Sequence, residues 1–600
     1  MKKKVYLILL ALGLLHNSYT QKIELSSNKK TFSIVENTPN KITLRSYVND
    51  LSFSTVKGNS SLFSSLAVQG YVTNHKIGAP DLPTLNKLLD IPYGASIEIN
   101  ILGQTEEIID LSSHSIKSIY PSQPSVSKGE DASSVPFYFD EATYSSDIFI
   151  SDEIAKVVPL GKMRGHQLGR LEISPFQYNP VTNILKVISE VEFEINFVGA
   201  DHALTDVIHS KYNSSHFNAS FDQLINSAKA QNKDMLTSYP VKYVIVSDPS
   251  FQTALQPFVE WKTKKGFTVI EAYTNDPAVG NTTASIKAFL ENLYNSGTAN
   301  DPSPSYLLLV GDVAQVPSFS GITGSHVSDL YYCEYDGAGD FYPELYYGRF
   351  PATNISEVQN MVNKTIQYEQ YLFPDPSFLG RAVMISGVDA SMAPTYGNGQ
   401  INYGTDYYIN PAHSINSQTY LYPASGSSGA QIIQDVNNGA GFVNYTAHGY
   451  GQGWADPSFT CTDVYNMTNE HQLPLMIGNC CQSNMFDDPE CFGEALLRVE
   501  DRGAIGYIGG SNNTYWDEDY WWAVGAGSIT VNPTYNPLTL AAYDRTFHEN
   551  GEAAADWHIT NAQLMLAGNL AVTQGGGDED YYYEIYHLMG DPSLMTYFGV

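Results

Sequence analysis

Residues 241–310 read, in succession, VKYVIV (241–246), FQTALQPFVEWKTKK (251–265), FTVIE (267–271), SIKAFLENLY (285–294) and YLLLV (306–310), and this stretch decides the fold. The first, third and fifth segments are short apolar runs typical of buried strands, whereas the second and fourth are typical of helices. Alternating strands and helices predict a mostly parallel sheet with helices on both faces. The predicted fold class from about residue 240 onward is therefore α/β.

The same alternation continues toward the C-terminus. A helix is predicted at Glu357–Leu372, and the strand pattern restarts at Ala382–Ile385. We therefore divide this region into two sheet-bearing halves, residues 236–372 and 373–600.

Two strand ends in the second half carry reactive side chains. The strand-like run GFVNYT (441–446) is followed by Ala447, His448 and Gly449, and the run LPLMI (473–477) is followed by GNCC (478–481). In a right-handed β-α-β unit both strands are parallel, so their C-terminal ends lie at the same sheet edge, where α/β proteins place their sites. We expect His448 and Cys481 to face each other there.

A thiol beside an imidazole is the pattern of nucleophilic catalysis, because the imidazole takes up the thiol proton. The backbone N–H groups of Gly449 and Cys481 are candidates for an oxyanion hole. The chain has five cysteines, an odd number, so in an exported protein at least one thiol stays unpaired.

Residues 21–235 have a different pattern, in which apolar and polar residues alternate as in half-buried antiparallel strands, for example in LKVISEVEFEINF (185–197). A polar stretch at 228–238 then predicts a domain boundary. His202, His209 and His216 lie just before it, and their spacing suits no compact metal site. We interpret them as solvent-exposed linker histidines.

The N-terminus and the composition indicate an exported, soluble protein. Three lysines precede an apolar run that ends at Leu15, which predicts a signal peptide over residues 1–20. With 32 basic and 63 acidic residues the formal charge is −31, which argues against nucleic acid as a partner. No transmembrane segment is expected in the mature chain, and no motif calls for an organic cofactor.

Several motifs resemble the gingipain family of secreted bacterial cysteine peptidases, and the lysine-specific gingipain in particular. They are VGDVAQVP (310–317), SDLYY (328–332), GRF (348–350), NYTAHG (444–449), WADP (454–457), CFGEAL (491–496) and GDPSL (590–594). The resemblance implies a caspase-like fold in two subdomains, preceded by a β-rich inhibitory prodomain that would be residues 21–235. It assigns Cys481 as nucleophile and His448 as its partner, with Asp389 orienting the imidazole.

The resemblance also implies a pocket for a basic side chain. An aromatic wall with carboxylates, YWDED (515–519), suits an aliphatic stem with a cationic head. By analogy Trp516 would line the pocket, Asp519 would bind lysine, Thr446 would lie alongside, and Asp329 would serve arginine-specific members. We expect cleavage after Lys or Arg, with Lys favoured.

A structural calcium site is the predicted cofactor. The loop DGAGDFYPE (336–344) offers oxygen ligands that suit Ca²⁺ rather than a transition metal. A similar gingipain loop holds calcium, which implies Asp336, Asp340, Tyr342 and Glu344 as ligands.

Two other functions fit parts of the sequence. The same fold without activity would be a surface adhesin or interaction protein. A secreted glycosidase would need paired carboxylates on opposing strand ends, and none stands out as His448 and Cys481 do.

Overall fold

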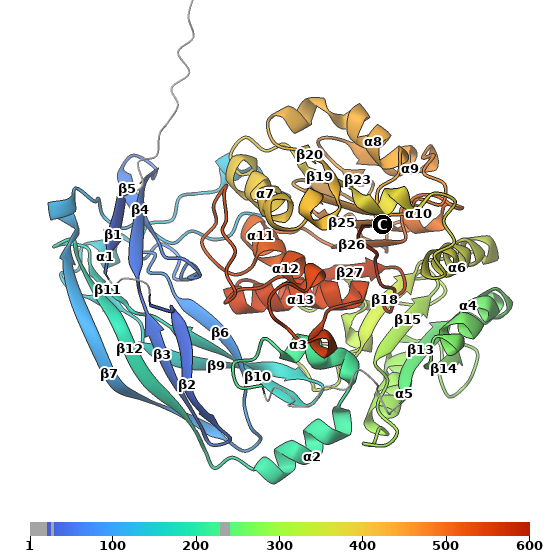
Figure 1. The fold of residues 1–600 in the computed structure, drawn as a ribbon, viewed down its shortest axis with the longest axis horizontal. Coiled ribbons are helices and arrows are strands. Elements are labelled where there is room, and N and C mark those ends of the chain that lie inside the picture. Colours follow the sequence, from blue (N-terminus) through green and yellow to red (C-terminus); the bar gives the residue numbers. More distant parts are fainter. Residues whose placement is uncertain (1–20, 26–28, 228–239, 600) are drawn as a thin grey trace, which may run out of the picture.

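The computed structural model describes residues 21–25, 29–227 and 240–599, and it consists of a β-rich N-terminal part beside a larger α/β part (Figure 1). The predicted signal peptide and the predicted boundary at 228–238 lie outside the described residues. Among the described residues no helix is long and apolar enough to cross a bilayer.

The N-terminal part is built of antiparallel sheets, in the orders β1-β4-β5, β6-β10-β9 and β2-β3-β12-β11-β8, with β7 also paired to β12. The long strands β7 and β12 pair along almost their whole length, and alternate β12 side chains enter the core. The bounds are β1 Gln21–Glu24, β2 Phe32–Thr38, β3 Lys41–Tyr47, β4 Asp50–Lys57, β5 Leu62–Ala67, β6 Leu85–Asp90, β7 Ser96–Asp110, α1 Glu141–Tyr144, β8 Ile150–Ser151, β9 Ala155–Met163, β10 His166–Ile173, β11 Phe176–Asn179, β12 Ile184–Val198, α2 His202–Tyr212 and α3 Asn218–Phe221.

The α/β part contains one ten-stranded sheet with flanking helices, so the predicted fold class is confirmed. In spatial order its strands are β14 Phe267–Tyr273, β13 Val241–Ser247, β15 Tyr306–Val310, β18 Tyr346–Phe350, β27 Tyr586–Met589, β26 Gly506–Gly510, β25 Leu475–Asn479, β21 Phe442–Thr446, β19 Arg381–Ser386 and β20 Asn416–Tyr420. The helices are α4 Gln252–Lys264, α5 Thr283–Asn295, α6 Ile355–Glu369, α7 Asn398–Tyr407, α8 Gly429–Asn437, α9 Cys461–Tyr465, α10 Phe492–Arg498, α11 Trp516–Val524, α12 Ala542–Phe547, α13 Asn561–Gly575 and α14 Glu579–Ile585.

The two predicted halves share this single sheet. β27, from the end of the chain, lies between them: it is parallel to β18 and antiparallel to β26. All other neighbouring strands of the sheet are parallel. The two half-sheets therefore run in opposite directions.

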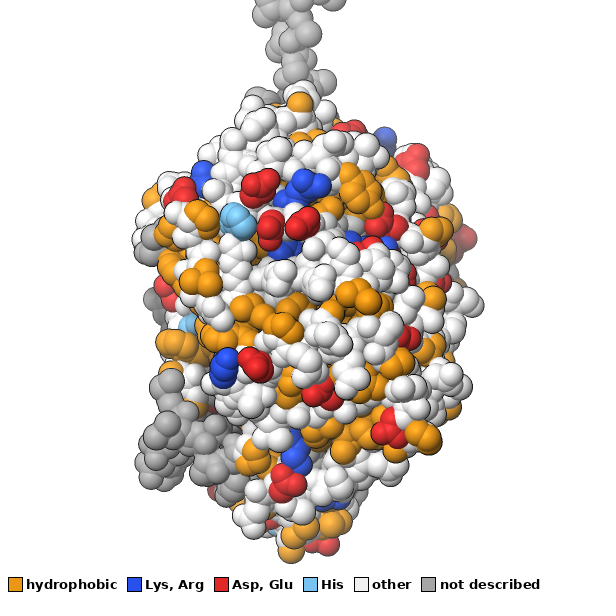
Figure 2. Space-filling model, turned by 90° about the vertical axis from the view of Figure 1, so that its right-hand side faces the viewer, with side chains coloured by type: hydrophobic (Ala, Val, Ile, Leu, Met, Phe, Trp, Pro, Cys, Tyr) orange, Lys and Arg blue, Asp and Glu red, His pale blue; other side chains and the backbone are white. Residues whose placement is uncertain are grey.

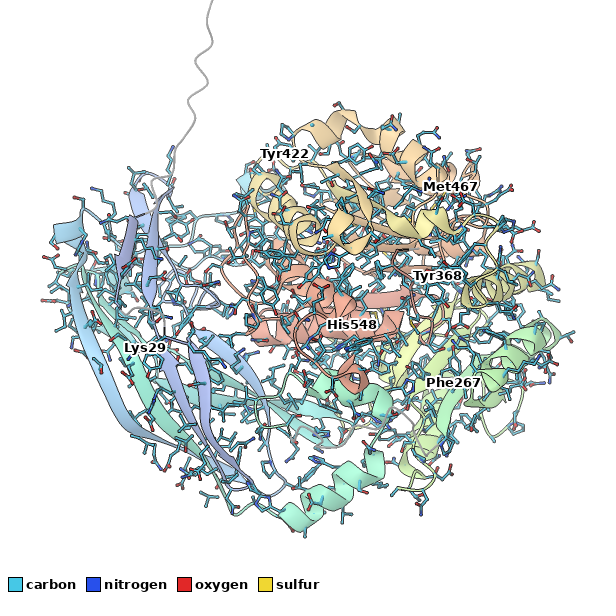
Figure 3. All side chains as sticks on the ribbon, in the orientation of Figure 1. Lys29, Phe267, Tyr368, Tyr422, Met467 and His548 are labelled. Atoms are coloured by element: carbon cyan, nitrogen blue, oxygen red, sulfur yellow. The ribbon has the colours of Figure 1, made fainter. Side chains whose placement is uncertain are left out.

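The two parts of the molecule are packed together. The side chains drawn in Figure 3 project from both into the region between them. Phe217 of the N-terminal part stacks on Tyr346 of β18 with ring centroids 4.0 Å apart, and His216 Nδ1 lies 2.7 Å from Tyr306 Oη. The prediction of solvent-exposed linker histidines is therefore wrong for His216, and also for His209, which is partly buried against Asp90.

The surface carries mixed charge. On the face that Figure 2 shows, the described Lys and Arg side chains are scattered among acidic and neutral ones and form no broad basic patch. This agrees with the net charge of −31.

Candidate active site

His448 and Cys481 follow neighbouring strands of the sheet. β21 and β25 are parallel, and Thr446 is paired in register with Asn479. Each reactive residue therefore lies two positions beyond a strand end, at the same edge of the sheet. Strand register therefore brings the two residues to one edge of the sheet, and their role as a catalytic pair stays a prediction.

Both ring nitrogens of His448 face acceptors. Nε2 lies 2.9 Å from Asp389 Oδ2, and Nδ1 contacts the carbonyl oxygen of Lys128, a residue of the N-terminal part. The hydrogen bond to Asp389 is the main reason that the pKa of His448 is raised. An imidazole between two acceptors is stabilised as the imidazolium, which cannot take up another proton.

Cys481 is held as a neutral thiol. Its side chain is buried, and burial raises its pKa to about 12, although the Thr514 N–H, 3.3 Å from Sγ, partly opposes the shift. Burial therefore favours the thiol of Cys481 over the thiolate, the form in which a cysteine acts as a nucleophile.

The N-terminal part places Lys128 in a closed pocket at the same strand ends. Its ammonium lies 2.7 Å from Asp519 Oδ2, 2.9 Å from Thr446 Oγ1 and 2.8 Å from the Asn479 carbonyl oxygen. It also lies 4.6 Å from the centroid of the Trp516 ring. The Lys128 and Asp519 side chains are both 0% exposed, so the ammonium has exchanged all of its water for protein acceptors.

The backbone around Lys128 is bound like an added strand. The Lys128 N–H donates to the Thr514 carbonyl at 2.7 Å, and the Trp516 N–H donates to the Val126 carbonyl at 3.0 Å. Ser127 and the residue between these two, Tyr515, form an antiparallel bridge. Main-chain pairing with a side chain in a pocket is the general mode by which extended peptides are recognised.

Three of the four predicted pocket residues therefore surround one cation: Thr446, Trp516 and Asp519. Asp519 is in turn held by the hydroxyl groups of Tyr582 and Tyr586, at 3.0 and 2.6 Å.

Asp329 does not belong to this pocket. Its two carboxylate oxygens accept hydrogen bonds from Arg349, both at 2.7 Å, in a buried ion pair. The prediction that Asp329 binds substrate is corrected accordingly: the arginine that neutralises it comes from β18 of this chain.

The predicted oxyanion residues lie where the two strand ends meet. A methyl group added at Gly449 would come within 2.7 Å of Cys480 Sγ and 2.8 Å of the Cys481 carbonyl oxygen. Only glycine allows this approach. The assignment of the Gly449 and Cys481 N–H groups to an oxyanion hole stays a prediction.

Lys128 itself was missed by sequence reasoning. It lies in the Ser-rich run PSVSKG (124–129), and no local pattern distinguishes it from the other lysines of the N-terminal part. One chemical argument could have found it. A pocket predicted to bind a basic side chain, in a protein predicted to carry its own inhibitor, indicates that a lysine or arginine of that inhibitor occupies the pocket.

The predicted calcium loop lies against the N-terminal part. Asp336 pairs with Lys162 Nζ at 3.0 Å, and Asp340 accepts a hydrogen bond from the Lys162 N–H at 2.7 Å. Glu344 is buried and accepts the Arg164 N–H at 2.6 Å, and no described residue donates a hydrogen bond to its Oε1. Burial raises the pKa of Asp340 to about 6, and burial followed by the charge of Asp336 raises that of Glu344.

Replacing Asp389 by Asn should lower kcat/KM on the order of 10²-fold, since the amide does not stabilise the imidazolium. The Asp389 hydrogen bond raises the pKa of His448, and His448 must be neutral to accept the thiol proton, so the acidic limb of the pH–rate profile should move to lower pH in the variant. A profile with the same acidic limb as the parent protein would contradict the role of Asp389.

Cys481 and His448 thus follow adjacent parallel strands of the α/β sheet, and Asp389 is hydrogen-bonded to His448, which is the arrangement expected of a caspase-like cysteine peptidase. Residues 236–597 match the model of peptidase family C25, and residues 25–222 match that of its propeptide, Propeptide_C25. The chain belongs to peptidase family C25, which confirms the resemblance seen in the sequence.

Individual relatives agree with this assignment. Lys-gingipain of Porphyromonas gingivalis is 38% identical over 558 residues, covering 92% of this chain and 32% of the relative. A solved structure described as a protease shares 38% identity, with a TM-score of 0.56, over 61% of this chain and 81% of that one. The structure of the Arg-specific cysteine proteinase gingipain R, at 22% identity and TM-score 0.50, covers 60% of this chain and 79% of its own, and shows the shared fold. This chain spans about a third of the length of its Lys-gingipain relative.

Proposed function

We propose that this protein is a secreted cysteine endopeptidase, made as a zymogen, that cleaves peptide bonds after lysine. The observation that carries the proposal is Lys128, bound by Asp519, Thr446 and the Asn479 carbonyl beside His448. Lys128 belongs to the same chain and already occupies the pocket, so it exemplifies the type of side chain that the pocket can bind.

Three acceptors match the three N–H donors of an ammonium. A guanidinium presents five donors in a planar fork and needs a wider, bidentate partner, so the closed pocket favours lysine over arginine. The similarity to a protein named Lys-gingipain supports the same preference.

The geometry also indicates how the reaction would proceed in the mature enzyme. A substrate lysine would take the place of Lys128, and its carbonyl carbon would be presented to Cys481. With the Lys128 carbonyl gone, His448 Nδ1 is free to accept the thiol proton and to deliver it to the leaving amine. The N–H groups of Gly449 and Cys481 would receive the developing oxyanion.

Substrate profiling tests the proposed specificity. Asp519→Asn should lower kcat/KM for substrates with lysine before the cleaved bond by about 100-fold or more, because a buried ammonium loses its counter-charge. Asp580→Asn, which changes an exposed acid of α14, is the matched control and should leave the profile unchanged. A parent enzyme that prefers apolar or acidic residues at this position would refute the specificity.

The N-terminal part is proposed to be the inhibitor of this enzyme. It occupies the pocket with Lys128, engages His448, and contributes residues such as Leu88 and Met163 to the main apolar core. The proposed release by cleavage between Lys229 and Ser238 falls outside the described residues, as does the signal peptide on which secretion rests. Labelling with a thiol-reactive lysyl peptide, compared with the Cys481→Ala variant, distinguishes this function from a catalytically silent adhesin.

Calcium is the proposed structural cofactor, held by the carboxylates of Asp336, Asp340 and Glu344 and by the loop at Tyr342. The fit rests on Glu344 Oε1, for which the described residues provide no hydrogen-bond partner, and on the negative charge of Asp336 beside the buried Glu344, which a cation would neutralise. Lys162 supplies a positive charge to the same loop while the N-terminal part is bound.

Chelation should lower the melting temperature by a few degrees, since an ion that binds only the folded state stabilises it. Asp340→Asn should reproduce the loss and become insensitive to chelator, whereas Asp487→Asn, on an exposed acidic turn, should behave like the parent protein. An unchanged melting curve of the parent protein in excess chelator would contradict the proposed calcium site.

A further inference from the structure

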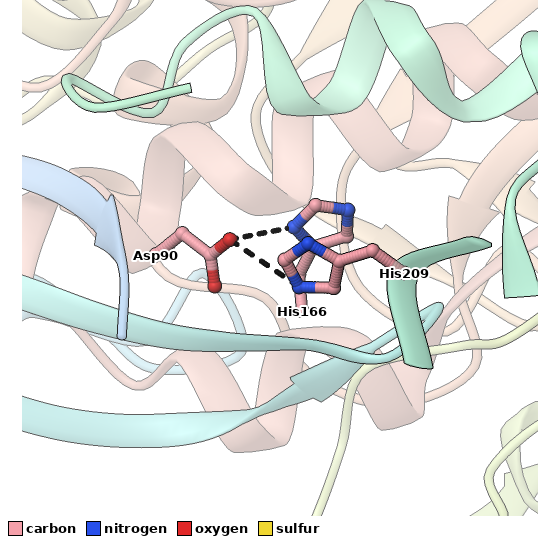
Figure 4. A group of neighbouring side chains, drawn as sticks. All are labelled: Asp90, His166 and His209. Atoms are coloured by element: carbon pink, nitrogen blue, oxygen red, sulfur yellow. Dashed lines mark hydrogen bonds and ion pairs between the residues drawn. The ribbon is translucent and has the colours of Figure 1, made fainter. Parts of the chain in front are cut away.

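Three ligand-type side chains meet inside the N-terminal part (Figure 4). Asp90 ends β6, His166 begins β10, and His209 lies in α2. Asp90 Oδ2 is 2.8 Å from His166 Nδ1 and 3.5 Å from His209 Nε2. Three separate segments of the chain therefore converge on one carboxylate.

Asp90 Oδ2 and His166 Nδ1 are hydrogen-bonded to each other, but two other atoms of the cluster are not satisfied. Asp90 Oδ1 and His209 Nε2 are buried atoms without a hydrogen-bond partner in the described structure. Buried polar atoms are nearly always satisfied by protein, water or an ion. Two orphaned atoms on adjacent ligand-type side chains therefore point to a missing partner.

Neighbouring residues hold the Asp90 backbone and the His166 ring in place. Asn226 donates to the Asp90 carbonyl and accepts from its N–H, both at 2.8 Å. The His166 ring packs on Phe221 with centroids 4.0 Å apart. Outer contacts of this kind orient ligands in metal sites.

The donor set identifies the class of ligand. Two imidazoles and one carboxylate suit Zn²⁺, with water as a fourth ligand, and do not suit the all-oxygen preference of Ca²⁺ or Mg²⁺. Ligand atoms in a tetrahedral zinc shell lie about 3.3 Å apart, close to the 2.8 and 3.5 Å found here. The cluster borders a cavity of about 840 Å³, which admits water and metal.

We propose that Asp90, His166 and His209 form a zinc site that fixes α2 to β6 and β10. The two rings are stacked, with centroids 3.8 Å apart and an angle of 23°. Coordination of one ion by both imidazoles therefore requires the two rings to rotate out of this stacked arrangement. The site then anchors α2 just before Ser214–Phe221, the segment that packs on β15 and β18.

The proposal does not depend on the proposed function, and it is tested on the full chain carrying Cys481→Ala, which removes self-cleavage. Zinc chloride is titrated by calorimetry, and cobalt(II) reports nitrogen coordination by its visible absorption. We expect one tight site per chain, a higher melting temperature with zinc, and at least about 100-fold weaker binding in His209→Gln and in His166→Gln.

His202→Gln is the matched control, since His202 lies on the same helix but contacts Asn40 instead. It should bind zinc like the parent chain. Equal melting temperatures without zinc show that each variant is folded. Absence of tight binding in the parent chain, or equal binding by the His209→Gln and His202→Gln variants, would overturn the proposal.

Discussion

Cys481→Ala is expected to abolish peptidase activity, by at least about 10⁴-fold in kcat/KM, together with self-processing of the full chain. The thiol follows β25 at the strand end that faces His448, and its Sγ accepts the N–H of Thr514, the residue that also binds the Lys128 backbone. Removing it leaves a bound substrate without a nucleophile. Hydrolysis of a fluorogenic lysyl peptide measures the effect.

The neighbouring Cys480 supplies the control. Its Sγ lies 3.4 Å from Ser483 Oγ and packs against Gly449, in the interior. Cys480→Ala should lower stability by about 1 kcal/mol, as expected for a small buried truncation, and retain most activity. If Cys480→Ala were inactive and Cys481→Ala active, the nucleophile would be Cys480.

Lys128→Met should remove most of the latency of the full chain. It leaves Asp519 as a buried charge without its partner, and breaking a buried pair in this way costs about 3–5 kcal/mol. That corresponds to roughly 10²- to 4 × 10³-fold weaker binding of the N-terminal part at the active site. Initial activity of the freshly purified full chain, and its rate of self-processing, are the measurements.

Lys117→Met, an exposed lysine of the same part, should remain as latent as the parent chain. Full latency in Lys128→Met would show that other contacts of the N-terminal part suffice to close the site.

The parts of the site that the sequence predicted are those governed by local order. His448 and Cys481 could be paired because each follows a strand directly, and parallel connections are right-handed. Trp516 and Asp519 could be placed beside them because the segment follows the neighbouring strand β26. These arguments need only strand order and short sequence distances.

The parts of the site that could not be predicted depend on contacts between segments that are distant in the sequence. Lys128 reaches the pocket from another part of the chain, and His209 finds Asp90 and His166 only after the N-terminal sheets have formed. Asp329 appeared in a family motif, yet a single partner, Arg349, decides its role. Pairings of this kind leave no periodicity in the sequence.

The central position of β27 in the sheet affects the order in which the folded site can be completed during synthesis. The ribosome adds Tyr586–Met589 after every other strand of the sheet, so β18 and β26 keep open edges until then. Tyr586, which binds Asp519 at 2.6 Å, belongs to this last strand. The pocket around Lys128 is thus completed last, long after Lys128 itself has been synthesised. A nascent chain therefore never has a complete pocket without the N-terminal residue that occupies it.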